Sequence, residues 1–270
     1  TYMYENSFYE PKLRSAPNMK RMQCDRKYSG VKIRSDSNKK DVLELEFVIQ
    51  PILSSLENKV YAYEMLSRVS VNTIFDSELT VEEIFFCLDG EIIKQIALSQ
   101  VDIAKKIERQ LGKALISVNI PVNLLIDNGF VDHVISLSPS KLAIEINVLR
   151  YSFDNPIIER NLDRFRNCGI KLWLDDYLVL SHASNVVLTE VEWDLIKIDK
   201  SYFSDKLNEK ITAKVLTDRV NKHSKDGVIF EGVETIYQRS EIALDNVYLQ
   251  GYYLSYPISV GEILRMIESQ

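Results

Sequence analysis

Acidic and amide side chains recur in this chain near the ends of short apolar runs. Asp175 and Asp176 close the run KLWLDD, and Glu145 lies within LAIEIN. The whole set comprises Glu64, Asn119, Glu145, Asp175, Asp176, Lys197, Asp199, Glu231 and Gln250. A single acid at such a position is usually a helix cap or a surface charge. A set of this size indicates a shared site, provided that the runs are strands whose ends meet.

The donor types in this set predict a hard divalent cation. Four or more carboxylates at one place repel one another unless cations neutralise them. Carboxylate and amide oxygens suit Mg²⁺ or Mn²⁺ rather than Zn²⁺. The adjacent Asp175 and Asp176 can each reach a different ion, and two ions can clamp a phosphodiester and activate a water molecule. We expect Lys197 to point into the same site, where it holds that water or stabilises charge on the phosphate.

The apolar runs that carry these residues predict eight strands, at 45–54, 60–69, 114–121, 141–148, 171–177, 195–201, 227–233 and 248–255. Segments of helical period lie between several of them, at 81–112, 157–169 and 209–227. This alternation, without a glycine-rich phosphate loop, favours an irregular TIM-like (β/α)8 barrel over an open sheet. Only SLENK separates the first two strands, which predicts an antiparallel pair. The strand ends of a barrel converge on one face, so the polar residues should meet there.

Charge is distributed unevenly along the chain. The net charge is −6, yet residues 1–41 carry 10 Lys/Arg against 5 Asp/Glu, which leaves 23 against 34 for the remainder. We therefore expect a basic N-terminal extension over residues 1–43, ordered at most in part, and a barrel domain over residues 44–270. The extension is either a solvated leader or an arm for a protein partner. The acidic body argues against a nucleic acid polymer as ligand.

The remaining composition indicates a cytoplasmic protein. The sequence contains no run of 18 apolar residues that would predict a membrane span, and the polar start TYMYENSFYEPK is unlike a signal peptide. The three cysteines, Cys24, Cys87 and Cys168, have no paired spacing of the kind that zinc sites or disulfide frameworks use.

Eight segments in order resemble the EAL domains, the cyclic di-GMP phosphodiesterases of bacterial signalling. They are IQPI, YEMLSR, SVNIP, LAIEI, LWLDDY, DLIKIDKSYF, IFEGVET and LQGYYLSYPIS, and they span roughly residues 44–265. The resemblance implies hydrolysis of cyclic di-GMP to linear pGpG with two Mg²⁺ or Mn²⁺ ions. It assigns metal binding to Glu64, Asn119, Glu145, Asp175, Asp176 and Glu231. Lys197 matches the lysine beside the catalytic water and acts with Glu64 and Glu231, and substrate contacts fall to Gln50, Arg68, Asp199, Glu234 and Gln250.

Two departures from the family leave an alternative open. Where the family continues F-G-T-G after the aspartates, this chain has Tyr177–Leu180, and Val148 stands where a glutamate normally anchors that loop. We expect the altered loop to be packed by its apolar residues. An active phosphodiesterase is favoured because the metal ligands and the lysine are present. The alternative is a weak or inactive EAL protein that acts as a cyclic di-GMP receptor or a protein-binding regulator. A homodimer is compatible with either reading.

Overall fold

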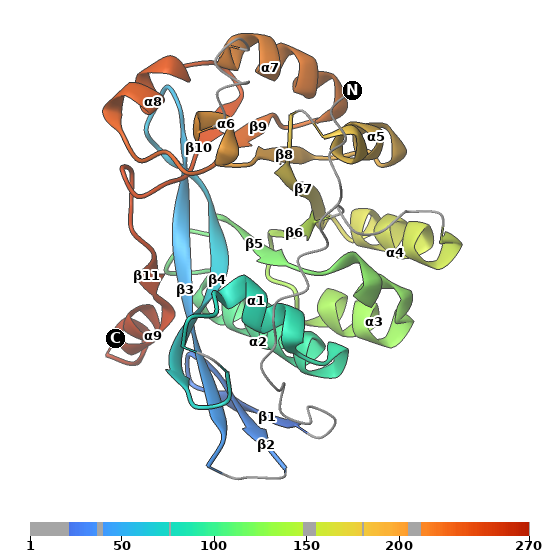
Figure 1. The fold of residues 1–270 in the computed structure, drawn as a ribbon, viewed down its shortest axis with the longest axis vertical. Coiled ribbons are helices and arrows are strands. Elements are labelled where there is room, and N and C mark those ends of the chain that lie inside the picture. The colour runs from blue at the N-terminus through green and yellow to red at the C-terminus, as the bar shows by residue number, and fades with distance from the viewer. Residues whose placement is uncertain are drawn as a thin grey trace.

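Eight strands close into a barrel (Figure 1). The structure, a computed structural model, describes residues 22–36, 40–75, 77–147, 155–179, 181–204 and 212–269. The barrel strands are β3 (Val42–Ser54), β4 (Val60–Asn72), β5 (Leu115–Asn119), β6 (Leu142–Asn147), β7 (Lys171–Tyr177), β8 (Leu195–Ile198), β9 (Val228–Phe230) and β10 (Val247–Leu249). Each of the eight predicted strands corresponds to one of them.

One strand of the barrel runs against all the others. Strands β4 to β10 pair in sequence order and run parallel, whereas β3 is antiparallel to both of its barrel neighbours, β4 and β10. Only residues 55–59 separate β3 from β4, and so short a connection cannot hold a crossover helix. The predicted irregular TIM-like (β/α)8 barrel with an antiparallel first strand pair is therefore confirmed.

Helices connect the parallel strands and lie outside the barrel (Figure 1). They are α1 (Val81–Cys87), α2 (Gly90–Ile107), α3 (Asn128–Leu137), α4 (Pro156–Asn167), α5 (His182–Glu190), α7 (Ala213–Val220) and α8 (Ile236–Glu241), with the short helices η1 (Val122–Ile126), α6 (Ser201–Ser204) and η3 (Asn221–His223). The predicted helical segment 81–112 divides because the Asp89 side chain accepts a hydrogen bond from the Glu91 amide and begins a new helix. None of the helices in the described ranges is long and apolar enough to cross a membrane.

The barrel interior contains an apolar layer formed by Ile52, Ala62, Ala143, Trp173, Leu195 and Ile229, all fully buried. Tyr61 packs beside this layer and stacks on Tyr248, with their ring centroids 3.8 Å apart. Because side chains alternate along a strand, the residue two positions farther along each parallel strand also points inward. The apolar layer therefore supports a second layer nearer the strand ends, and that second layer is polar.

Two further strands extend the sheet at its N-terminal side. Strand β1 (Met22–Lys27) pairs with β2 (Gly30–Ser35), and β2 pairs with the first half of β3. Val31 and Ile33 on β2 are fully buried, and they alternate with exposed or half-buried basic residues. This alternation is typical of a strand, although no strand was predicted in this segment. Residues 1–21 and 37–39 lie outside the described residues, so the domain boundary at residue 43 stays a prediction.

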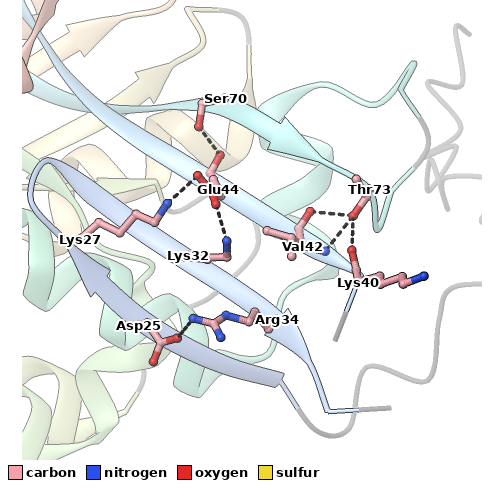
Figure 2. A network of polar contacts seen from close by, with 9 residues as sticks. All are labelled: Asp25, Lys27, Lys32, Arg34, Lys40, Val42, Glu44, Ser70 and Thr73. Carbon is pink, nitrogen blue, oxygen red and sulfur yellow. Dashed lines mark hydrogen bonds and ion pairs between the residues drawn. The ribbon is translucent and has the colours of Figure 1, made fainter. Parts of the chain in front are cut away.

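The solvent face of this sheet is held by ion pairs (Figure 2). Glu44 on β3 forms ion pairs with Lys27 at 2.6 Å and with Lys32 at 2.7 Å, and Arg34 forms an ion pair with Asp25 at 2.7 Å. At the C-terminal end of the chain, β11 (Ile258–Ser259) pairs with β3 and leads into α9 (Val260–Glu268), which packs against the same strand. Strand β3 therefore pairs with β4 at one edge and with β2, β11 and β10 in turn at the other.

Candidate metal centre

Each of the eight barrel strands contributes one polar side chain to the layer above the apolar one. The residues lie on the strand or directly after it: Gln50, Glu64, Asn119, Glu145, Asp175, Lys197, Glu231 and Gln250. On five of the parallel strands the polar residue follows a member of the apolar layer by two positions, as Glu145 follows Ala143 and Asp175 follows Trp173. The period of the strands and the closure of the barrel together bring these side chains into one site.

Lys197 lies at the centre of this layer and is 1 % exposed. Its Nζ lies 2.6 Å from Glu145 Oε2, 2.8 Å from Glu231 Oε1, 3.0 Å from Asp175 Oδ1 and 3.3 Å from Glu64 Oε2. Burial alone would lower the pKa of Lys197, but these carboxylates outweigh it and raise that pKa well above its ordinary value. The lysine therefore stays charged and serves as the internal counter-ion of the acids.

The carboxyl groups around Lys197 differ in their affinity for protons. Burial and the charge of Glu64 raise the pKa of Glu145 well above its ordinary value, against the opposing charge of Lys197. Burial raises the pKa of Glu231 to about 8, with Lys197 opposing the shift and Asp175 reinforcing it. One ammonium group cannot neutralise this many carboxylates, so the charge of the site favours the binding of further cations.

Amide side chains hold Glu64 in place. Burial would raise the pKa of Glu64, but the charge of Lys197 and hydrogen bonds from Gln250 and Asn119 keep it below its ordinary value. Asn119 Nδ2 donates to Glu64 Oε1 at 3.0 Å, and Gln250 Nε2 donates to Glu64 Oε2 at 2.7 Å. Gln250 also donates to Gln50 at 3.2 Å, and Gln50 donates to the Ser255 carbonyl at 3.1 Å. These contacts fix the Glu64 carboxylate in its ionised form, in which it can bind a cation.

The two adjacent aspartates reach the same site because the strand bends between them. Side chains at successive positions of a strand point to opposite faces, so Asp176 would ordinarily point away from Asp175. Asp176 has a φ of 52°, in the left-handed region, and the pairing of β7 with β8 shifts register between Leu174 and Tyr177. Oxygens of Asp175, Asp176 and Glu231 consequently lie within 4.8 Å of one another. Burial and the charge of Asp175 raise the pKa of Asp176 to about 7.

The donor set fits divalent cations that prefer oxygen. The site offers the carboxylates of Glu64, Glu145, Asp175, Asp176 and Glu231 together with the Asn119 amide, and the cluster of these described residues includes neither His nor Cys. Glu145 Oε1 is buried and accepts no hydrogen bond from the described residues. A buried carboxylate oxygen without a donor is costly unless a cation takes the donor's place. These residues can therefore hold Mg²⁺ or Mn²⁺.

Three predicted substrate residues lie outside this cluster. The Arg68 side chain is 62 % exposed and pairs with Glu46 at 2.7 Å. Glu234 is exposed, and Asp199 is half-buried, where its Oδ1 accepts a hydrogen bond from the Ser201 amide at 2.8 Å. The charge of Asp199 nevertheless contributes to the raised pKa of Asp176, so it lies near the rim of the site. Substrate contacts by these three residues stay predictions.

Two groups that the structure places at the site were not predicted from the sequence. Asn147 Nδ2 donates to Asp176 Oδ2 at 2.5 Å, and the Ser255 carbonyl accepts the hydrogen bond from Gln50. Asn147 follows Glu145 by two positions on β6, so the strand period was a signal that could have found it. No side-chain signal marks a backbone carbonyl such as that of Ser255.

The segment after the aspartates packs against α5. Val179 is 5 % exposed, and the Tyr177 hydroxyl donates to Asn185 Oδ1 at 2.9 Å. Asn185 in turn donates to the Ser181 carbonyl at 2.7 Å. Over residues 177–179 these contacts agree with the expectation that the altered loop is packed. Val148 and Leu180, on which the rest of that expectation depends, lie outside the described residues.

Comparison with known proteins adds a family match to this geometry. The family model described as "EAL domain" matches residues 36–257. An EAL domain protein from Listeria monocytogenes superposes with a TM-score of 0.65 at 22 % identity, covering 83 % of this chain and 92 % of its own. The PaMucR phosphodiesterase in complex with c-di-GMP gives 0.66 at 22 % identity, with coverages of 81 % and 94 %.

A manganese and cyclic di-GMP complex of Klebsiella pneumoniae BlrP1 gives a TM-score of 0.62 at 20 % identity. It covers 89 % of this chain but 60 % of the BlrP1 chain, which extends beyond the shared region. At these identities the solved structures show that the fold is shared. A comparison with curated proteins finds no match to this chain.

Proposed function

Because this chain belongs to the EAL-domain family, we propose that it is a divalent-metal-dependent phosphodiesterase that hydrolyses cyclic di-GMP to linear pGpG. The observation that carries the proposal is one polar cluster inside the barrel, in which four carboxylates pair with Lys197, Asp176 lies beside two of them, and Asn119 bonds Glu64. The solved complexes of PaMucR and BlrP1 contain cyclic di-GMP, and the BlrP1 complex also contains manganese. These relatives support the choice of substrate and metal.

Electrostatics makes metal a requirement of this proposal. Five carboxylates around one ammonium group leave the fully ionised site strongly negative, and such a site repels the phosphates of a dinucleotide. Two bound Mg²⁺ or Mn²⁺ ions would neutralise this charge and supply the chemistry of water activation and phosphate polarisation. Glu64, Asn119, Glu145, Asp175, Asp176 and Glu231 are the residues that would hold them.

Lys197 has the proposed role of positioning and charge stabilisation. Four carboxylates fix its ammonium group, so it needs no reorganisation when negative charge develops on the reacting phosphate. Its raised pKa keeps it a proton-bearing donor rather than a base. It can hold the attacking water by a hydrogen bond, and Glu64 and Glu231 would bind the ions beside it. Gln50, Gln250, Arg68, Asp199 and Glu234 are proposed to contact the substrate.

A second candidate is a receptor that binds cyclic di-GMP without turnover. The observation that favours it is the packing of residues 177–179 against α5, because a loop held in this way leaves less freedom for the metal site to adjust. A cytoplasmic location, a homodimer and a protein partner for residues 1–43 accompany either candidate as predictions.

Incubation of the purified protein with cyclic di-GMP and Mn²⁺ or Mg²⁺ separates the two candidates. The products are followed by chromatography, and binding is measured in parallel by calorimetry with Ca²⁺ as the ion. Formation of pGpG that stops on addition of EDTA supports the enzyme. Binding without pGpG supports the receptor, and the lack of both would refute the assignment of cyclic di-GMP.

A further inference from the structure

The five acids of the site are not all held in the same way. Lys197 forms ion pairs with four of them, Glu64, Glu145, Asp175 and Glu231. Asp176 is not among its ion-pair partners, although it lies with Asp175 and Glu231 in the group of oxygens within 4.8 Å. The fifth carboxylate therefore needs another group to fix its direction.

The backbone of Asp176 makes this need greater. A φ of 52° lies in the left-handed region, which costs more for a residue with a Cβ than for glycine, and the pairing of β7 with β8 shifts register at the bend. The bend turns Asp176 toward the site, but the backbone conformation alone does not fix the rotamer of its side chain. If a metal-binding side chain becomes ordered only when the ion binds, the entropy lost in that ordering lowers the affinity of the site for the ion.

Asn147 supplies the missing contact. It is the last residue of β6 and the direct strand partner of Asp175, so its side chain lies beside the bend. Its Nδ2 donates to Asp176 Oδ2 at 2.5 Å, and among the described residues it is the hydrogen-bond donor that reaches this carboxylate. One oxygen of Asp176 is thereby engaged by the amide, and the same carboxylate lies with those of Asp175 and Glu231 in the group of oxygens within 4.8 Å.

We propose that Asn147 is a positioning residue that holds the Asp176 carboxylate in the orientation needed for metal binding. The inference rests on the proposed function, because it assumes that Asp176 binds an ion. Lys197 then orders four ligands and Asn147 orders the fifth. Hydrogen bonds to ligating side chains commonly contribute 10- to 100-fold to metal affinity, and the exposed position of Asn147 places our expectation near the lower end, at about 10-fold.

The test is a titration with Mn²⁺ alone, without nucleotide, followed by calorimetry and by the EPR signal of free Mn²⁺. Asn147→Ala removes the amide, and Asn147→Leu removes it while keeping a side chain of similar size. We expect both variants to bind Mn²⁺ about 10-fold more weakly than the unchanged protein, equivalent to about 1.4 kcal/mol. Because Asn147→Leu keeps the bulk of the side chain, it separates the effect of losing the donor from the effect of losing volume.

Asn161→Ala is the matched control for general destabilisation. Asn161 is fully buried on α4 outside the barrel, and its Nδ2 donates to the Leu125 carbonyl at 2.7 Å and to Asn128 at 3.0 Å. This variant should melt at a lower temperature than the unchanged protein and yet bind Mn²⁺ with the same affinity.

Three outcomes would count against these ideas. Unchanged Mn²⁺ affinity in Asn147→Leu overturns the positioning role. An equal loss of affinity in Asn161→Ala overturns it as well, since the effect would then come from reduced stability. Both results leave the proposed function standing, whereas an unchanged protein that binds no Mn²⁺ sinks the proposed metal chemistry and this inference with it.

Discussion

Replacement of Lys197 by methionine is the most direct test of the site. The lysine is 1 % exposed, and its Nζ lies 2.6 to 3.3 Å from four carboxylates. Methionine fills similar space but leaves those acids facing one another without a cation. Removal of one partner from a buried ion pair costs about 3–5 kcal/mol, against a total stability of about 5–15 kcal/mol for a typical domain. At about 2–4 °C per kcal/mol, the melting temperature of the metal-free variant should fall by roughly 6–20 °C.

The loss should also depend on pH. Without Lys197, the pKa values of Glu145 and Glu231, which burial already raises, should rise further. A carboxyl group whose pKa is higher in the folded state than the unfolded value near 4.5 makes the folded protein hold more protons. Stability then falls as the pH rises from that unfolded value through the folded pKa. The Lys197→Met variant should therefore be destabilised more at about pH 9 than at about pH 6.

Thermal unfolding in EDTA measures the effect, with Lys94→Met as the matched control. Lys94 Nζ lies 2.6 Å from both Glu91 and Asp127, but its pairs are near the surface, where each contributes about 0–1 kcal/mol. Saturating Mn²⁺ should restore part of the stability of Lys197→Met, because cations then neutralise the acids. In the catalytic assay, kcat should fall far more than substrate affinity. If Lys197→Met melts in EDTA as the Lys94 control does, the buried counter-ion role is wrong.

Four further predictions concern the ligands, the metal, the pH dependence and one glycine. Hydrolysis should be abolished, without unfolding of the barrel, in each of the variants Glu64→Ala, Asp175→Ala and Glu231→Ala. Near-normal turnover at saturating Mn²⁺ in any of them would contradict the two-ion assignment. Ca²⁺ should support cyclic di-GMP binding in calorimetry but little pGpG formation, because its coordination is longer and looser; equal turnover with Ca²⁺ and Mg²⁺ would argue against this site. Mn²⁺ affinity should rise with pH and level off above about 8, since Asp176 and Glu231, with pKa values of about 7 and about 8, must lose protons to bind; a flat profile would exclude them as ligands. Gly251→Ala should lower the melting temperature and weaken cyclic di-GMP binding, because the added Cβ would lie 2.1 Å from the Val233 carbonyl oxygen and displace the turn that carries Ser255; unchanged melting would show that the turn can move without loss.

The sequence by itself determined the class of fold and predicted the type of chemistry. The apolar runs of β3 to β10 and the helical period between several of them follow from local side-chain patterning, which every strand and helix expresses independently. The short linker at residues 55–59 already required an antiparallel pair. Carboxylates and an amide without thiolate or imidazole predict an oxygen-preferring ion, because ligand type is a property of the residue and not of its surroundings.

Only the tertiary structure decided which polar residues contact one another. Alternation along a strand says which side chains share a face, but barrel closure and register set the distances between strands. Those distances make Lys197 the partner of four acids, and they pair Arg68 with Glu46. The bend at Asp176 and the hydrogen bond from Asn147 depend on a register shift between β7 and β8, which no local pattern records. Electrostatic and hydrogen-bond energies fall steeply with distance, so these roles are settled only when strands far apart in the sequence come together.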